Sequence, residues 1–312
     1  MRLLITGCSG LLGLNLALLA RDRYAVSGCF FSHAVSIAGV ETFPADLARP
    51  GVAEGVLDRV RPDAILHTVG LTSVDGCEEH PALAWRLNVD VAGAVARVAG
   101  ERQIRLVHLS TDHLFAGTSS WHDESEPPAP INTYAQTKAE AEQVVQQVCP
   151  HALIVRTNFY GWGSPLRASF SDWILAAMRR GDELRMFTDV FFTPLLINHL
   201  GEAILELAAA GASGLYHVAG SDRLSKHDFA QRLAEVFDVA HPRIRPASVE
   251  EAPLRARRPK DMSLATDKVA RLLGRRMPAV GEGLAGLRRL ERAGWPETIA
   301  AAVAGARLGA RE

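Results

Sequence analysis

The sequence predicts an α/β fold, in which a doubly wound parallel sheet carries a smaller mixed lobe in its C-terminal half. Short apolar runs alternate with helical periodicity up to about residue 157, a pattern typical of parallel strands joined by crossover helices. A glycine-rich turn follows the first run, at the edge where such sheets bind ligands. Beyond residue 160 the alternation loosens. We therefore expect a sheet domain at 1–160 and mainly a second lobe at 161–312, with some segments returning to the sheet.

The amino-acid composition excludes several classes of function for this protein. The 312 residues are 48% hydrophobic and 22% charged, as in ordinary globular proteins. A formal net charge of -1 gives no global field for nucleic acid or an anionic membrane. The four cysteines have neither disulfide-framework nor zinc-type spacing, and the apolar run at 11–20 is too short to span a bilayer. We expect a cytoplasmic protein with no metal, nucleic-acid or membrane partner.

Three glycines stand between the first predicted strand, 2–6, and a Leu-rich helix. Gly7 permits a tight turn, Gly10 lets the backbone approach a pyrophosphate, and Gly13 lets helix and strand pack closely. The amides at the helix start attract phosphate, so the cofactor contacts should extend along the backbone. The sequence therefore predicts a Rossmann-type dinucleotide-binding domain, whose first contacts are Gly7, Gly10, Leu11, Leu12 and Gly13.

The second predicted strand, 24–31, ends where the adenosine ribose of a dinucleotide should lie. An acidic residue there would favour NAD, but Ser32 and His33 follow instead. A hydroxyl and an imidazole can bind a 2′-phosphate, so we expect NADP(H) as the preferred cofactor and NAD(H) as the alternative. An ordinary turn at the end of the strand is the competing interpretation of these two residues.

The third predicted strand, 40–43, ends before Asp46 and Leu47. The Asp46 carboxylate can accept a hydrogen bond from the adenine amino group, with Leu47 beside it. An Asp after a strand is equally typical of a helix N-cap, and a helix is predicted next, at 51–61. Both roles for Asp46 therefore stay open.

The fourth predicted strand, 64–67, ends in small residues, which leave room for a ligand at the carboxyl edge of the sheet. A long helix is predicted at 81–101, and within it Asn88 is expected to make a polar packing contact. The contacts expected at this strand end are Thr68, Val69 and Gly70 with the cofactor and Thr72 with the substrate.

The stretch from 105 to 138 carries the predicted chemistry. A strand at 105–110 ends in hydroxyls, and a proline-containing loop leads to a helix on which Tyr134 and Lys138 share one face. A phenol has a pKa of about 10, and a neighbouring cation favours its ionised form. We predict catalytic roles for Thr111, Tyr134 and Lys138, with Ser110 beside the cofactor. The competing interpretation is a half-buried Tyr beside a solvated Lys.

The second half is predicted from weaker patterns. Another strand is expected at 152–157. Strands at 184–187 and 214–218 and helices at 198–210 and 226–239 are assigned to the smaller lobe, and an Ala-rich tail at 300–310 to a terminal helix or a frayed end. A proline-flanked basic cluster is either a solvated turn or a diphosphate clamp, and its members are Arg255, Arg257, Arg258 and Lys260.

Together, the GxxGxxG turn, the Ser-Thr-Asp strand end and the Tyr-x-x-x-Lys helix resemble the extended short-chain dehydrogenase/reductase family over nearly the whole chain. Closer matches resemble its dTDP-4-dehydrorhamnose reductase branch: Leu-Ser-Thr-Asp-His-Leu-Phe-Ala-Gly at 109–117, Pro-Ile-Asn-Thr-Tyr at 130–134 and Ile-Val-Arg-Thr at 154–157. Arg-Pro at 258–259 with Ser-Leu at 263–264 resembles that branch's C-terminal substrate segment.

The resemblance implies roles for particular residues. Tyr134 would donate the proton, Lys138 would bridge Tyr134 and the nicotinamide ribose, and Thr111 would hydrogen-bond the reacting oxygen. It implies NADPH-dependent reduction of the keto group of a nucleotide-linked 4-keto-6-deoxysugar. The residues expected to contact this substrate are Thr72, Asp112, His113, Asn158 and Arg258.

Two departures from the branch pattern bear on the substrate. His113 stands where a Tyr is usual, and Phe-Phe-Thr-Pro at 191–194 matches only loosely. Two other functions stay open: a nucleotide-sugar epimerase or dehydratase that holds NAD, and a non-catalytic nucleotide-binding subunit, as in the regulatory beta subunit of methionine adenosyltransferase. The nucleotide and the sugar are not identified, and a homodimer is a further expectation.

Overall fold

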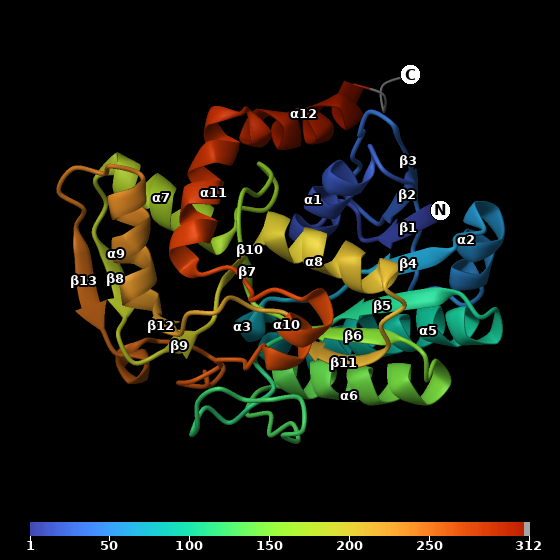
Figure 1. The fold of residues 1–312 in the computed structure, drawn as a ribbon, viewed down its shortest axis with the longest axis horizontal. Coiled ribbons are helices and arrows are strands. Elements are labelled where there is room, and N and C mark those ends of the chain that lie inside the picture. Colours follow the sequence, from blue (N-terminus) through green and yellow to red (C-terminus); the bar gives the residue numbers. More distant parts are fainter. Residues whose placement is uncertain (309–312) are drawn as a thin grey trace.

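A computed structural model of the chain describes residues 1–308. Its centre is a seven-stranded sheet in which every neighbouring pair of strands is parallel (Figure 1). The order β11-β6-β5-β4-β1-β2-β3 confirms the predicted doubly wound α/β fold. The strands are β1 (Arg2–Thr6), β2 (Ala25–Phe30), β3 (Val40–Pro44), β4 (Ala64–His67), β5 (Arg105–Leu109), β6 (Leu153–Arg156) and β11 (Gly214–His217).

Helices cover both faces of this sheet. On one face, α1 (Leu11–Ala20) and α8 (Ile197–Ala209) contribute to the larger apolar core. On the other, α2 (Val52–Val60), α5 (Val91–Glu101) and α6 (Thr133–Val148) form a second core with the sheet. Because neither face meets water, the central strands are mostly apolar and do not alternate between apolar and polar residues; all four residues of β4 are buried.

The predicted helix at 81–101 is interrupted in the structure. It consists of α4 (Pro81–Trp85), a π-helical turn at Arg86–Asp90 and then α5; the short α3 (Val74–Glu79) precedes it. Asn88 lies in the π-helical turn. Its Oδ1 accepts from the Leu71 amide at 2.7 Å, and its Nδ2 donates to the Thr137 hydroxyl at 2.9 Å. The expected packing role of Asn88 is therefore confirmed.

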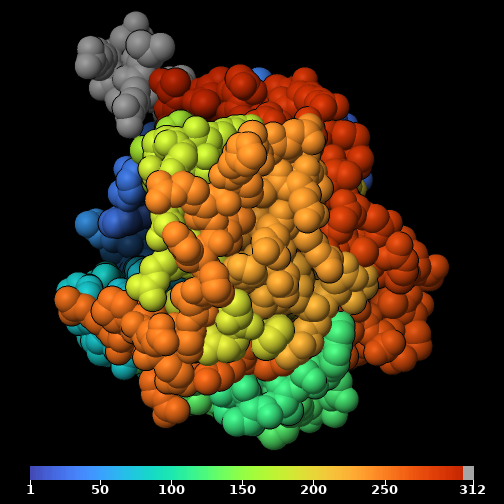
Figure 2. Space-filling view, turned by 90° about the vertical axis from the view of Figure 1, so that its left-hand side faces the viewer, coloured from blue at the N-terminus to red at the C-terminus, as the bar shows by residue number. Residues whose placement is uncertain are grey.

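The smaller lobe lies at the left of Figure 1. It contains α7 (Phe170–Arg180), β8 (Leu184–Phe187), β9 (Phe191–Phe192), β12 (Leu224–Ser225), α9 (Lys226–Val236) and β13 (Ile244–Ala247). Aromatic rings fill its interior, with Phe229 packed 5.6 Å from Phe170 and 5.7 Å from Phe192, centroid to centroid. In Figure 2, orange residues of α9 and β13 occupy most of its outer face, beside yellow-green residues of α7 and β8.

One strand was assigned to the wrong part of the molecule. The strand predicted at 214–218 is β11, which pairs with β6 at the edge of the main sheet and does not belong to the smaller lobe. Likewise α8, predicted at 198–210 for the lobe, packs on α1. A four-residue strand carries no signal for which sheet it joins, whereas covering the edge of β6 satisfies a full row of backbone groups.

The remaining elements connect the two parts. The pair β7 (Phe159–Tyr160) and β10 (Leu195–Leu196) joins the sheet to the lobe, and α10 (Asp267–Leu273) and α11 (Val280–Arg292) follow. The tail forms α12 (Trp295–Leu308). This helix contacts the sheet domain: the Trp295 indole donates to the Asn15 Oδ1. Among residues 1–308, no helix combines the length and the apolarity that a bilayer crossing requires.

Candidate active site

The glycine turn has the geometry that its three positions predict. Gly7 adopts a left-handed φ of +78°, and a Cβ at Gly13 would overlap the Gly7 carbonyl. At Gly10 an added Cβ would meet the Gly7 oxygen at 3.2 Å and no other atom beyond its chain neighbours within 4 Å, so the side of Gly10 away from Gly7 is open. Helix α1 begins at Leu11 with neither a side-chain cap nor an acidic residue in its first turn. Its first amides are therefore available to an anionic ligand.

A cleft of about 490 Å³ opens beside this turn, at the carboxyl ends of four strands. Nine predicted cofactor contacts line it: Gly7, Gly10, Ser32, His33, Asp46, Leu47, Thr68, Val69 and Gly70. Leu12 lies in the apolar core, so it can reach a ligand in the cleft only through its backbone amide. The side chains that line the cleft and that the sequence did not predict include Ser9, Leu83, Arg86, Leu87, Leu166 and Arg167.

At one end of the cleft, Ser32 and His33 are exposed and bonded to each other, with 3.0 Å between Oγ and Nδ1. Asp46, which follows β3, lines the same cleft. Its carboxylate accepts from the Ala48 amide at 3.2 Å and from the Arg49 Nε at 3.1 Å. Asp46 thus caps the turn before α2, and the ion pair with Arg49 reduces its negative field toward the cleft.

The three predicted catalytic residues come together from the segment that follows β5 and from α6. Tyr134 and Lys138 are 8% and 5% exposed, and Thr111 is 4% exposed. The Lys138 Nζ donates to the Leu109 carbonyl at 2.6 Å. The Thr111 hydroxyl donates to Asp112 at 3.3 Å and acts to lower the pKa of Tyr134. Asn132 fixes the start of α6, because its side chain accepts from the Ala135 amide at 2.9 Å. The competing picture of a solvated lysine is wrong for this helix.

Burial shifts the pKa values of two residues in this cluster. It raises the pKa of Tyr134 above its usual range, and the opposing influences are the Thr111 hydrogen bond and the charge of Arg167. The expectation that Lys138 brings this pKa toward neutrality is therefore wrong. Burial also lowers the pKa of Lys138 to about 8, while the charge of Glu142 raises it. A phenol that stays protonated is suited to donate a proton, not to accept one.

On the other side of Tyr134 lie the predicted substrate contacts. The Asn158 Nδ2 donates to Asp112 at 2.8 Å, and the His113 ring is edge-on to Tyr134 at 5.7 Å. Burial lowers the pKa of His113 to about 3, so its imidazole is neutral. Burial raises the pKa of Asp112, and the Lys226 ammonium opposes this shift. Lys226 was not predicted, because the first residue of α9 lies more than a hundred positions away.

Arg258 and Thr72 have partners within the protein. The Arg258 guanidinium donates to Asp75 at 2.9 Å and to the Ala256 carbonyl at 2.7 Å. The Thr72 hydroxyl accepts a hydrogen bond from Arg167. Arg258 therefore ties the 255–263 segment to α3, and a bidentate diphosphate contact would require it to release Asp75.

The rest of the basic cluster is largely paired as well. Arg255 pairs with Glu79 at 2.8 Å. Lys260 pairs with Glu250 at 3.0 Å. These contacts favour a surface role for both side chains, whereas the charge of Arg258 acts on His113 and lowers its pKa.

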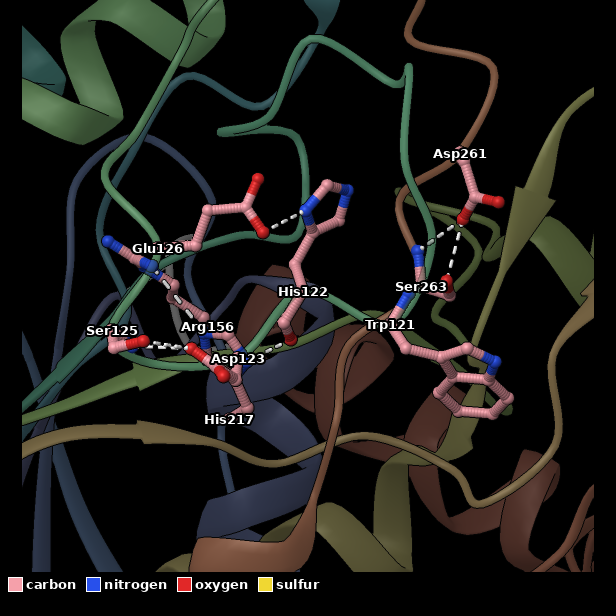
Figure 3. Close-up of polar contacts among 9 residues, drawn as sticks. All are labelled: Trp121, His122, Asp123, Ser125, Glu126, Arg156, His217, Asp261 and Ser263. Atoms are coloured by element: carbon pink, nitrogen blue, oxygen red, sulfur yellow. Dashed lines mark hydrogen bonds and ion pairs between the residues drawn. The ribbon is translucent and has the colours of Figure 1, made fainter.

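The loop between β5 and α6 is fastened to the segment after residue 260 (Figure 3). The Trp121 amide donates to the Ser263 hydroxyl at 2.7 Å, and that hydroxyl donates to Asp261 at 2.6 Å. The His122 amide donates to the Ser263 carbonyl at 2.9 Å, and its imidazole lies 2.8 Å from Glu126. These bonds hold the loop whose two ends carry Thr111 and Tyr134.

The family described as RmlD substrate binding domain matches residues 1–289. The chain belongs to this family. Membership confirms the predicted reductase branch of the extended short-chain dehydrogenase/reductases, and the parallel sheet described above is the fold of that branch.

Relatives of this RmlD-family chain span most of its length. A probable low-salt glycan biosynthesis reductase, Agl14, from Haloferax volcanii is 31% identical over 293 residues, covering 91% of this chain and 96% of its own. The dTDP-4-dehydrorhamnose reductase of Salmonella typhimurium is 35% identical over 208 residues, 64% of this chain and 67% of that protein. The dTDP-4-dehydrorhamnose reductase from Bacillus anthracis, solved in complex with NADP, has a TM-score of 0.82 and 27% identity, covering 92% of this chain and 98% of that one.

Proposed function

We propose that this RmlD-family protein uses NADPH to reduce the keto group of a nucleotide-linked 4-keto-6-deoxysugar. The observation that carries the proposal is the hydroxyl pair of Thr111 and Tyr134 with the buried ammonium of Lys138. This cluster adjoins the cleft, because Tyr134 belongs to an apolar cluster against which Leu71 packs, and Leu71 directly follows the cleft residue Gly70. A proton donor next to a dinucleotide cleft is the arrangement that carbonyl reduction needs.

The residues of the cleft fit a dinucleotide. The space at Gly10 and the uncapped start of α1 suit a pyrophosphate. We propose that Ser32 and His33 contact the adenosine ribose and that Asp46 and Leu47 contact adenine. The strand end formed by Thr68, Val69, Gly70 and Ser110 would complete the cofactor site together with Leu11, Leu12 and Gly13.

Each catalytic side chain has one role in the proposed reaction. NADPH, when bound, supplies the hydride. Tyr134 donates its phenolic proton to the oxygen on which negative charge develops, and Thr111 holds that oxygen in position. Lys138 donates to the nicotinamide ribose. Asp112, His113 and Asn158, with Thr72 and Arg258, would contact the substrate.

The comparisons support this proposal through the names of the relatives, which are reductases, and through NADP in the Bacillus anthracis structure. We propose a dTDP-linked sugar as the first substrate to test. Because His113, whose ring lies against Tyr134, replaces the usual Tyr, we propose that the sugar itself differs from dehydrorhamnose. The four cysteines are free and buried, which supports the proposed cytoplasmic location, while the homodimer stays a prediction.

The test is to mix the purified protein with NADPH and dTDP-4-dehydrorhamnose and to follow both NADPH oxidation and the sugar product. Stoichiometric oxidation of NADPH with formation of a dTDP-6-deoxyhexose supports the proposal. Interconversion of sugars without net NADPH consumption would indicate the epimerase alternative. Dinucleotide binding without turnover of any 4-keto-6-deoxysugar nucleotide would favour the non-catalytic subunit.

A further inference from the structure

The cleft contains an arginine that the strand pattern could not place there. Arg86 is the first residue of the π-helical turn and lines the cleft together with Leu83 and Leu87 of the same helical stretch. It is exposed, and within residues 1–308 its side chain makes no hydrogen bond or ion pair. Arg97 and Arg102, farther along the same stretch, each pair with a carboxylate. Arg86 is thus a cation available to a ligand.

The charges around the cleft indicate which kind of ligand group would bind to Arg86. The basic side chains among the lining residues are His33, Arg86 and Arg167. Arg167 donates to Thr72, and its charge acts to lower the pKa of Tyr134, so we assign Arg167 to the catalytic end of the cleft. The acidic lining residue is Asp46, which is paired with Arg49 at 3.1 Å. The lining of the cleft is therefore net positive and suited to an additional anion.

We infer that Arg86 and His33 bind the 2′-phosphate of NADP, so that Arg86 is the residue that makes this protein select NADP over NAD. The inference rests on the proposed function, which places the dinucleotide in this cleft. A phosphate with two negative charges is the group that distinguishes the two cofactors, and a guanidinium binds phosphate oxygens in bidentate fashion. The basic residue that binds this phosphate usually follows the second strand. In this protein we assign that role to Arg86, from a helical stretch that begins some fifty positions later.

The position of Arg86 in a π-helical turn supports a binding role, because such turns occur frequently at functional sites. Asn88 holds the turn against the end of β4 through its bonds to Leu71 and Thr137. The side chain of Arg86 therefore projects from a fixed backbone toward the cleft, which reduces the entropy lost on binding.

The test compares Arg86→Gln with the control Arg102→Gln, which removes the same charge from a site outside the cleft. Dissociation constants are measured for NADP⁺, NAD⁺, adenosine 2′,5′-bisphosphate and AMP, and thermal unfolding checks the fold. Loss of one charge-assisted contact predicts that Arg86→Gln weakens NADP⁺ and the bisphosphate about ten- to a hundredfold, while NAD⁺ and AMP change little. Arg86→Lys should restore part of the selectivity, and the control should leave all four constants unchanged.

Each other outcome overturns the inference. Equal weakening of NADP⁺ and NAD⁺ would assign Arg86 to the adenine ring or to the fold. Unchanged constants in Arg86→Gln would leave it without a binding role. Failure of the parent protein to bind either dinucleotide would instead overturn the proposed function, and the inference with it.

Discussion

Cofactor binding should depend on pH through the buried ammonium of Lys138. Burial lowers the pKa of this group to about 8, so its charged form is present below pH 8 and is lost as the pH rises above it. About nine-tenths of the molecules carry the charge at pH 7 and about one-tenth at pH 9. A charge-assisted hydrogen bond contributes about 1.5–3 kcal/mol, which is enough to sustain a tenfold change. The Kd for NADP⁺ should therefore rise roughly tenfold from pH 7 to pH 9.

The assay is a titration of the protein with NADP⁺ at several pH values. In Lys138→Met, binding should be weaker than in the parent at pH 7 and should no longer change with pH. Burial also lowers the pKa of Lys226, to about 8, so Lys226→Met is the matched control and should retain the parent's pH dependence. A parent Kd that is constant from pH 7 to pH 9 would refute the role given to Lys138.

Three further predictions concern the surrounding structure. Gly10→Val should weaken dinucleotide binding strongly with little loss of stability, whereas Gly13→Val should lower the melting temperature, because a Cβ at Gly13 would overlap the Gly7 carbonyl and one at Gly10 would lie 3.2 Å from its oxygen; equal effects would contradict this distinction. Arg258→Ala should raise the KM for a nucleotide-sugar about ten- to a hundredfold, and Asp75→Asn should not; similar KM increases in both variants would make the pair purely structural. Glu142→Gln should cost about 3–5 kcal/mol in unfolding free energy, since it breaks a buried pair with Arg156 at 2.7 Å; urea denaturation measures this.

Most strands could be predicted because their sequence signals are local. The apolar runs that became β1, β4 and β8 end at turn residues, and their observed bounds agree with the predicted ones. The π-helical turn at Arg86–Asp90 could not be predicted in this way, because its sequence is compatible with an ordinary helix. β11 was misassigned for a related reason: its pairing with β6 depends on the path of the whole chain.

The site was predicted in part. Tyr134 and Lys138 share a helix face and could be paired from spacing alone, and the Ser-Thr-Asp strand end placed Thr111 beside them. Three residues reach the site from distant segments of the chain, and no local sequence pattern predicts them: Arg86, Arg167 and Lys226. The direction of the Tyr134 pKa was also wrong, because the desolvation of a buried phenolate exceeds what the nearby charges offset. Burial of that degree is a property of the packed core and not of the helix.

Turnover by Tyr134→Phe tests the central claim most directly. The substitution removes one oxygen and keeps the ring in its buried position, so the fold and the Kd for NADP⁺ should stay at parent values. With NADPH and a dTDP-linked 4-keto-6-deoxysugar that the parent reduces, the rate should fall by roughly 10²–10⁴, the usual contribution of a general acid. Reduction of that sugar at the parent rate would contradict the account, because the proton would then come from a group other than Tyr134.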